Sequence, residues 1–298
     1  MIRRFAMPAI AATVVLALGA CATPTAPAPA TAAPVAADTL GRIKAVKAIN
    51  VAFAGDSLPF SFVGPDNQPA GYSIDLCKHV IAAIGRAAGE PNLAVHWKVG
   101  TTAERLAMVG AGRADLECGN TTPTLSRMKS VDFSHLIFVD ASGFLVRGDA
   151  RIGRAAELGG KRIAVIAGTT NEASLERALR QHSITAVVVK VREAGEAVAL
   201  LESGGADAFA GDKLKLVGAA AQARDPKLFA LLPDDLSFEP YAFALPRNDT
   251  AMRATVNGAL GEVFRGPELD RIFARWFGTL GRPSQLLGSM YLLSITPE

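Results

Sequence analysis

Asp115-Leu-Glu-Cys-Gly-Asn-Thr-Thr-Pro-Thr-Leu-Ser-Arg127 is the most informative stretch of the chain, because a buried strand ends in it and a polar loop begins. We expect the strand to stop at Gly119. The loop after it carries two hydroxyls, on Thr121 and Thr122, and then the guanidinium of Arg127. Hydroxyls and free backbone N–H groups each donate a hydrogen bond, and Arg presents a planar fork of donors. The loop therefore predicts a site for a small carboxylate, and the alternative is a surface turn with a solvated Arg.

Strand-like and helix-like patterns alternate on both sides of this stretch. Strands are expected at 49–53, 93–97, 114–118, 162–167, 186–191 and 206–210, and helices at 72–84, 102–110, 171–181 and 194–203, followed by two helices between 247 and 277. Such alternation predicts parallel sheets covered by helices. The phrases 109–119 and 201–211 share a helix end, a Gly C-cap, Ala-Asp and a buried strand. The chain is therefore predicted to build two similar lobes.

Polar residues gather at three of the expected strand ends, in 119–127, 167–172 and 211–212. Open α/β lobes bind their ligands at the carboxyl ends of their strands. We therefore expect these three segments to form one site.

Residues 1–21 have the pattern of a signal peptide, with Arg3 and Arg4 before the apolar run Phe5–Ala20. The run is too short to span a bilayer comfortably. Its end, Leu18-Gly-Ala-Cys21, resembles the lipobox of bacterial lipoproteins, in which the Cys carries the lipid. The alternative is an ordinary signal-peptidase site with a Cys nearby. Residues 22–38 are almost all Ala, Pro and Thr, which predicts a tether without a core.

Composition limits the function of the remaining body. Removing the two Arg of the leader lowers the formal net charge from +3 to +1, and the body shows no basic patch for nucleic acid. Later apolar runs are too short for a membrane helix, so we expect an exported soluble domain that is anchored but does not span. About 260 residues suffice for two domains of modest size.

Cysteine and histidine positions give little sign of metal chemistry. Cys77 and Cys118 form either a disulfide in an oxidising compartment or two small buried apolar residues, and the sequence leaves both open. The four His are scattered without the spacing of metal ligands, so we predict neither a metal nor a cofactor.

Several longer phrases recur in the order typical of one protein family. They are Leu58-Pro-Phe-Ser-Phe, Gly71-Tyr-Ser-Ile-Asp-Leu, Glu117-Cys-Gly-Asn-Thr-Thr, Asp132-Phe-Ser, Ile137-Phe-Val, Gly168-Thr-Thr-Asn-Glu, Leu201-Glu-Ser-Gly and Trp276-Phe-Gly. From about residue 40 to 282, the chain resembles extracellular (periplasmic) solute-binding proteins of family 3, which serve ABC importers of polar amino acids. The glutamate/aspartate-binding branch is the most similar.

The resemblance implies a two-lobed α/β fold of the type II periplasmic-binding-protein class, with two parallel or mixed sheets flanked by helices. Lobe 1 would comprise 39–141 and 244–282, lobe 2 would comprise 142–243, and 283–298 would form a C-terminal tail. Two hinge strands near 138–146 and 241–245 would join the lobes.

The resemblance also implies roles for single residues. Arg127 would bind the α-carboxylate of a free amino acid with two guanidinium donors. The hydroxyl and N–H of Thr122 would donate to the same carboxylate, and Thr170 would donate to it from the second lobe. A helix N-terminus at Thr170 would favour the anion. Asp212 would face the α-ammonium, and its alternative is a solvated turn acid. The alternative role for the Gly-Thr-Thr turn is a capping box with Glu172.

Departures from the acidic-ligand branch concentrate where the ligand side chain would bind. Thr102 and Arg105 match two of its gripping residues. Ala54 and Ala194 stand where an Arg and a His are usual, and Asn120 replaces a Ser. The pocket is therefore expected to hold a neutral polar side chain, a larger one, or an acidic one more weakly.

The implied function is that of a lipid-anchored, monomeric binding protein in the periplasm. It would trap one free amino acid and deliver it to an ABC permease in the inner membrane, without enzymatic activity. Two alternatives remain, namely an exported enzyme similar to cyclohexadienyl dehydratase with Glu172 as its acid, and a ligand-sensing lipoprotein.

Overall fold

The computed structural model of the chain describes residues 38–278 and 281–295. The predicted signal peptide, the lipidation at Cys21 and the linker up to residue 37 lie outside the described residues. Among the helices that the structure describes, none combines the length and the apolar character needed to cross a membrane.

Helices and strands alternate along most of the described chain, as predicted. The α-helices are α1 (Thr39–Val46), α2 (Tyr72–Ala88), α3 (Thr102–Gly110), α4 (Thr170–Gln181), α5 (Ala194–Ser203), α6 (Lys213–Ala221), α7 (Thr250–Arg265), α8 (Glu268–Phe277) and α9 (Gln285–Leu293). Short 3-10 helices are η1 (Arg127–Lys129), η2 (Ala155–Leu158) and η3 (Pro226–Leu228). The strands are β1 (Ala48–Phe53), β2 (Asp56–Ser57), β3 (Ser61–Val63), β4 (Pro69–Ala70), β5 (Ala94–Val99), β6 (Leu116–Thr121), β7 (Val131–Arg147), β8 (Arg162–Ile166), β9 (Val187–Val191), β10 (Ala208–Asp212), β11 (Phe229–Leu231) and β12 (Ser237–Pro246).

Two of the strands that lead to the predicted site run further than expected. β6 continues past Gly119 to Thr121, because Thr121 still pairs with Ala242 of β12. β10 likewise continues to Asp212, which pairs with Ser142 of β7. The expectation that the first strand stops at Gly119 was therefore wrong by two residues, since the neighbouring strands extend the ladder.

The described strands form one mixed sheet of nine strands and one small sheet. The large sheet has the order β5-β1-β6-β12-β7-β10-β8-β9, with β11 paired to β7, and the small one has the order β2-β3-β4. Outer pairs such as β1–β5 and β8–β9 are parallel, whereas β7 and β12 are antiparallel to each other and to their neighbours. The two sheets expected for the two lobes are thus joined into one by β7 and β12.

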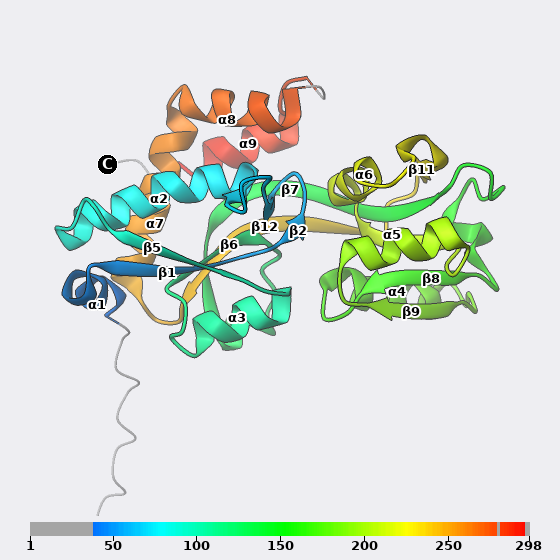
Figure 1. The fold of residues 1–298 in the computed structure, drawn as a ribbon, viewed down its shortest axis with the longest axis horizontal. Helices are drawn as coiled ribbons and strands as arrows, with labels where there is room; N and C mark the ends of the chain where they lie inside the picture. The colour runs from blue at the N-terminus through cyan, green and yellow to red at the C-terminus, as the bar shows by residue number, and fades with distance from the viewer. Residues whose placement is uncertain (1–37, 279–280, 296–298) are drawn as a thin grey trace, which may run out of the picture. The chain divides into compact units, whose positions relative to one another are not determined.

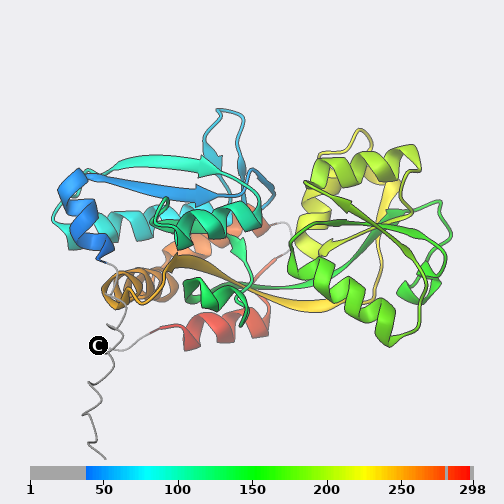
Figure 2. The same ribbon diagram turned by 90° about the horizontal axis from the view of Figure 1, so that it is seen from below.

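Buried apolar residues divide into clusters on either side of these two strands. We call lobe 1 the part built by α1–β6, α7, α8 and α9, and lobe 2 the part built by β8–β11 with their helices; Figures 1 and 2 show both groups, with β7 and β12 passing between them. The exact boundaries at 142 and 243 stay a prediction. In lobe 1, the buried rings of Phe60, Tyr72, Phe138, Tyr241 and Phe277 pack on one another and fix the β7–β12 pair against α2 and α8.

The segment where β7 and β12 pass from one lobe to the other carries two carboxylates. β12 pairs with β6 from Ala242 onward, and β7 pairs with β10 from Ser142 onward. Between these positions the two strands pair with each other, and Glu239 lies opposite Asp140. This segment overlaps the predicted hinge strands, so any hinge motion there would move both carboxylates.

Two further features of the fold concern the cysteines, which the sequence left open, and the C-terminal tail. Cys77 and Cys118 form a disulfide between α2 and β6, with their Cα atoms 6.0 Å apart. In the C-terminal tail, α9 packs on lobe 1, where the buried hydroxyls of Tyr291 and Tyr72 lie 2.6 Å apart.

Candidate functional site

Thr122 and Arg127 lie directly after β6, as the sequence indicated. Thr122 is 8% exposed, and its hydroxyl donates to Oε2 of Glu239 over 2.6 Å. Arg127 begins η1 and turns back, so that its Nη1 donates to the carbonyl of Thr122 over 2.7 Å. Its Nη2 lies 3.5 Å from the carbonyl of Gly168 in lobe 2. The loop after β6 therefore reaches from one lobe to the other.

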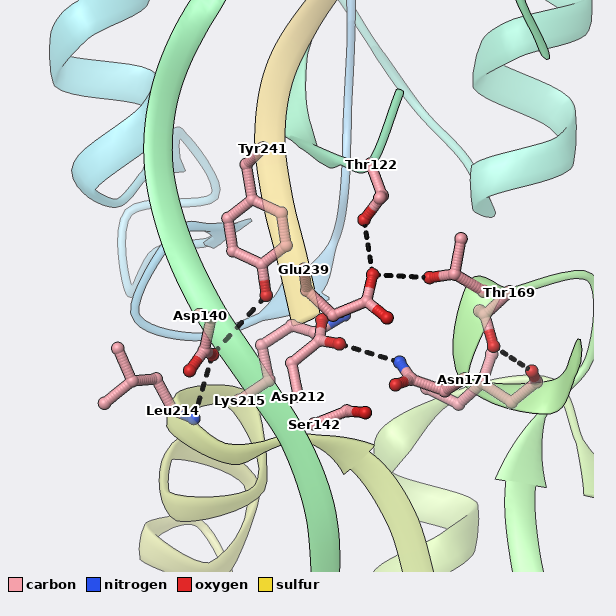
Figure 3. Close-up of polar contacts among 12 residues, drawn as sticks. Thr122, Asp140, Ser142, Thr169, Asn171, Asp212, Leu214, Lys215, Glu239 and Tyr241 are labelled. Atoms are coloured by element: carbon pink, nitrogen blue, oxygen red, sulfur yellow. Dashed lines mark hydrogen bonds and ion pairs between the residues drawn. The ribbon is translucent and has the colours of Figure 1, made fainter. Parts of the chain in front are cut away.

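The carboxylate of Glu239 is held by hydroxyls from both lobes (Figure 3). Besides Thr122, its Oε2 accepts from the hydroxyl of Thr170 at the start of α4, over 2.8 Å. Its Oε1 accepts from the hydroxyl of Ser237 over 2.6 Å. Glu239 is 1% exposed. We call Thr122, Arg127, Thr170, Ser237 and Glu239 the Glu239 cluster. In it, the two hydroxyls predicted to bind the carboxylate of a ligand bind an internal carboxylate.

The Gly-Thr-Thr turn that opens α4 caps that helix through Thr169, although Glu172 bonds the residue before the N-cap and so completes no capping box. Thr169 accepts from the N–H of Glu172 over 3.3 Å, and Glu172 accepts from the N–H of Gly168 over 2.6 Å. Lys190 forms an ion pair with Glu172. This ammonium and the hydrogen bond from Gly168 keep the pKa of Glu172 below its usual value although partial burial raises it.

Asp212 forms a second cluster at the end of β10, where it precedes the first turn of α6. It is 2% exposed, its Oδ1 accepts from the amide of Asn171 over 2.8 Å, and the ammonium of Lys215 lies 2.5 Å from its Oδ2. We call Asn171, Asp212 and Lys215 the Asp212 cluster, which Figure 3 shows beside Glu239. Oδ1 of Asn171 is buried and accepts no hydrogen bond from the residues that the structure describes.

Asp140 adds a carboxyl with an unusual pKa beside the Asp212 cluster. Its Oδ2 accepts from the N–H of Leu214 over 3.1 Å and lies 3.4 Å from the hydroxyl of Tyr241. Burial and the negative charge of Asp212 raise the pKa of Asp140 to about 7, against the opposing backbone hydrogen bonds and the charge of Lys215. Asp140 therefore titrates near neutral pH at the point where the lobes join.

Arg105 of α3 is neutralised inside lobe 1. Its Nε lies 2.7 Å from Oε1 of Glu117, and these residues are 3% and 0% exposed. Nη1 donates to the carbonyl of Gly100 over 2.7 Å. Nη2 lies 3.4 Å from the hydroxyl of Thr102 and 3.5 Å from that of Thr121. We call these five residues the Arg105 cluster; every guanidinium nitrogen in it has a partner from the protein.

A pocket of about 630 Å³ opens beside the Arg105 cluster, between α3 and the small sheet on one side and α4 and α6 on the other. Its walls include Asp56, Thr102, Arg105, Thr169 and Lys215. Asp56 of β2 accepts from the N–H of Ala194, the first residue of α5, over 3.0 Å. A carboxylate of lobe 1 thus already occupies the N-terminus of a lobe 2 helix.

The three clusters act on one another electrostatically. Burial lowers the pKa of Arg127, and the charges of Glu117, Glu239 and Asp212 oppose this while that of Arg105 adds to it. The structure therefore brings together the predicted residues Arg127, Thr122, Thr170, Asp212, Arg105 and Thr102 around one region. Asn120 lies in the buried part of β6 and is 7% exposed, and Cys21 lies outside the described residues.

Sequence reasoning missed several polar residues of the site. These are Asp56, Asp140, Asn171, Lys215 and Glu239. Glu239 carried a signal, because it is a charged residue within the otherwise apolar strand β12. Among the described residues, no three or more His, Cys, Asp or Glu side chains are grouped so that they could hold a metal ion.

Comparisons with known proteins place the chain in a family. Residues 49–279 match the bacterial extracellular solute-binding proteins, family 3. The chain is similar to the L-glutamate/L-aspartate-binding protein of Pseudomonas aeruginosa, with 33% identity over 82% of this chain and 83% of that protein. It is also similar to the solved structure of an ancestral arginine-binding protein bound to glutamine, with 25% identity, a TM-score of 0.69, and coverage of 78% of this chain and 98% of that one.

A further solved structure is that of an ancestral amino acid-binding protein described as a precursor of cyclohexadienyl dehydratase. It shares 26% identity and a TM-score of 0.69 over 80% of this chain and 99% of that one. The two-lobed, type II periplasmic-binding-protein fold agrees with these similarities. The chain belongs to the bacterial extracellular solute-binding proteins, family 3.

Proposed function

We propose that this protein binds one free amino acid between its lobes and presents it to the permease of an ABC importer. The Glu239 cluster is the observation that carries the proposal. Hydroxyls of Thr122 and Thr170, one from each lobe, converge on a buried carboxylate next to the guanidinium of Arg127. Donors placed in this way suit the α-carboxylate of a ligand, because charge-assisted hydrogen bonds are short and strong.

Asp212 supplies the opposite charge that a zwitterion needs. Its carboxylate is buried at the end of β10, where its charge acts on Arg127. An α-ammonium at Asp212 would compete with the ammonium of Lys215, which now lies 2.5 Å from Oδ2. The site therefore offers a cationic and an anionic partner for the two charged groups of one amino acid.

Capture and release would follow from motion about the segment where β7 and β12 pair with each other. This motion would change contacts between the lobes. They include the hydrogen bond of Thr170 to Glu239, the hydrogen bond of Ala194 to Asp56, and the ion pair of Arg192 with Glu104. Closure around a ligand would replace water by protein donors, which is the usual gain of hinge closure.

We further propose that the protein is exported to the periplasm and anchored as a monomer through a lipid on Cys21. The apolar leader before Cys21 and the Ala/Pro/Thr tether after it support this. Delivery to a permease of the inner membrane would need such a tether to leave the lobes free. Mass spectrometry of the mature protein tests the anchor, since lipidation removes residues 1–20 and adds the mass of acyl chains to the new N-terminus.

We do not propose an enzyme, although one similar structure is described as a precursor of a dehydratase. Glu172 was the candidate acid, but Lys190 and the N–H of Gly168 lower its pKa. It is therefore ionised at neutral pH and poorly suited to deliver a proton to a leaving hydroxyl.

A thermal-shift screen of the purified protein tests the proposed function. A ligand that binds only the folded state raises the melting temperature by mass action. At least one of the twenty amino acids should raise it, whereas prephenate should not. Arg127→Ala should weaken the binding of that amino acid about 100-fold, as expected for a lost charge-assisted pair. The proposal fails if no amino acid shifts the melting temperature, or if Arg127→Ala binds as well as the parent.

A further inference from the structure

The pocket beside the Arg105 cluster would receive the side chain of the ligand, provided that the proposed amino-acid function holds. In the acidic-ligand branch that the sequence resembles, donors and cations would grip a second carboxylate here. Two of these positions are Ala54 and Ala194. The question is whether the remaining groups could replace them.

Arg105 does not offer a free cation for a ligand. Glu117 pairs with its Nε at 2.7 Å, and the carbonyl of Gly100 accepts from its Nη1. The ion pair is almost fully buried, so its members would lose much free energy if a ligand separated them. Oε2 of Glu117 is buried without a hydrogen-bond donor among the described residues. This cluster therefore carries no net charge and has one acceptor in excess.

Asp56 places a further negative charge on the pocket wall. The N–H of Ala194, which opens α5 and would otherwise attract an anion, donates to Asp56 over 3.0 Å. A small cavity of about 20 Å³ lies beside it, with Asp56, Asn171, Ala194, Asp212 and Lys215 in its walls. Asn171 is 4% exposed, and its Oδ1 is the buried acceptor that receives no hydrogen bond from the described residues.

Lys215 is the remaining cation of this region, and its charge is balanced by Asp212 at 2.5 Å. The charges at the pocket rim also balance, with Arg113 and Arg192 against Glu104 and Glu193. The three clusters and Asp56 together contain three cations and four carboxylates. The cations are Arg105, Arg127 and Lys215, and the carboxylates are Asp56, Glu117, Asp212 and Glu239. The α-ammonium and α-carboxylate of a ligand leave this balance unchanged, so a side-chain carboxylate would add to an existing excess of negative charge.

We propose that the ligand is an amino acid whose side chain donates hydrogen bonds and is neutral or cationic, and that Asp56 determines this specificity. An amide, guanidinium or ammonium group would satisfy Oδ1 of Asn171 and the carboxylate of Asp56. A side-chain carboxylate would leave Oδ1 of Asn171 without a donor and would place a like charge beside Asp56, and each of these costs binding free energy.

Isothermal titration of the purified protein with glutamine, arginine, glutamate and aspartate tests the proposal. Glutamine or arginine should bind at least about tenfold tighter than either acid, a ratio equivalent to about 1.4 kcal/mol. Asp56→Asn keeps the acceptor for the N–H of Ala194 but removes the charge, and should lower this preference at least about threefold. Asp66→Asn is the matched control, because Asp66 lies in the exposed turn of the same small sheet and should change nothing.

The outcomes distinguish failure of the specificity proposal from failure of the proposed function. If amino acids bind but glutamate or aspartate binds tightest, the specificity proposal fails while the proposed function stands. The specificity proposal also fails if Asp56→Asn, with an unchanged melting temperature, keeps the full preference of the parent. If none of the twenty amino acids binds, both fail.

Discussion

The Glu239 cluster and the Arg105 cluster both bury a carboxylate in the same region, but they hold it in opposite ways. Glu239 is held by neutral hydroxyls, two of which come from different lobes. Glu117 is held by the guanidinium of Arg105 within lobe 1. In the first cluster the guanidinium of Arg127 has, among the described residues, only carbonyl partners at hydrogen-bond distance, whereas in the second the guanidinium of Arg105 is neutralised. We infer from this difference that a ligand carboxylate would bind Arg127, whose guanidinium has no carboxylate at hydrogen-bond distance among the described residues.

Glu117→Gln should have the largest effect on the difference between the two clusters, because it leaves Arg105 as a buried charge without its counter-ion. We expect the free energy of unfolding to fall by about 3–5 kcal/mol, measured by denaturant titration. The double variant Arg105→Gln with Glu117→Gln should recover most of that loss. Glutamate binding relative to glutamine should rise in the single variant, since a cation is released.

The control for this prediction is Glu262→Gln, because Glu262 is exposed and lies 3.9 Å from Arg86. It should alter stability by less than about 0.5 kcal/mol. A Glu117→Gln variant as stable as the parent would show that the buried pair is not what neutralises Arg105.

Asp140→Asn tests the junction between the lobes through pH. The raised pKa of Asp140, about 7, means that the folded protein retains a proton which the unfolded chain releases near pH 4. The stability that this group contributes is present at low pH and is lost as the pH rises through 7. Between pH 5 and pH 8, the free energy of unfolding of the variant should therefore rise relative to that of the parent. The rise should be on the order of 2 kcal/mol, or a few degrees in melting temperature.

The groups that face Asp140 define how this result would be read. They are Asp212, Lys215 and Tyr241, together with the N–H groups of Ala141 and Leu214. Asp132→Asn, at an exposed ion pair with Arg253, serves as the control and should show no such gain. Parallel pH curves of the parent and Asp140→Asn would contradict the assignment.

Glu239→Gln tests the other cluster and should have the smallest of these effects. The side chain keeps its shape but loses the negative charge that acts on Arg127. A ligand carboxylate would then meet less repulsion, so we expect the amino acid to bind up to about tenfold tighter in isothermal titration. Binding that is tenfold weaker would mean instead that Glu239 contacts the ligand ammonium.

The sequence predicted the regular alternation of helices and strands because apolar periodicity is a local property. The helix 102–110 and the strands 49–53 and 162–167 lie within a residue or so of α3, β1 and β8. The small sheet was missed, since β2 and β4 are two residues long and have no period to detect. The joining of both lobes by one sheet depends on the pairing of β12 with β6 and β7, which no local pattern records.

The candidate site was predictable only where it depends on local sequence. Arg127, Thr122 and Thr170 follow strand ends, which the fold class brings together. Their bond partner Glu239 lies 117 residues from Thr122 along the chain, so only the tertiary fold shows it. The role of Arg105 at the ligand stays a prediction; its bond to Glu117, twelve residues away, is a contact that no local pattern indicated.

A crystal structure of the protein with a bound amino acid, chosen as the tightest binder from titration, tests the central comparison most directly. The account predicts that the α-carboxylate lies within about 3 Å of the guanidinium nitrogens of Arg127. It also predicts that the Arg105–Glu117 ion pair stays intact. An α-carboxylate bound to Arg105, with Arg127 left on the carbonyls of Thr122 and Gly168, would contradict it.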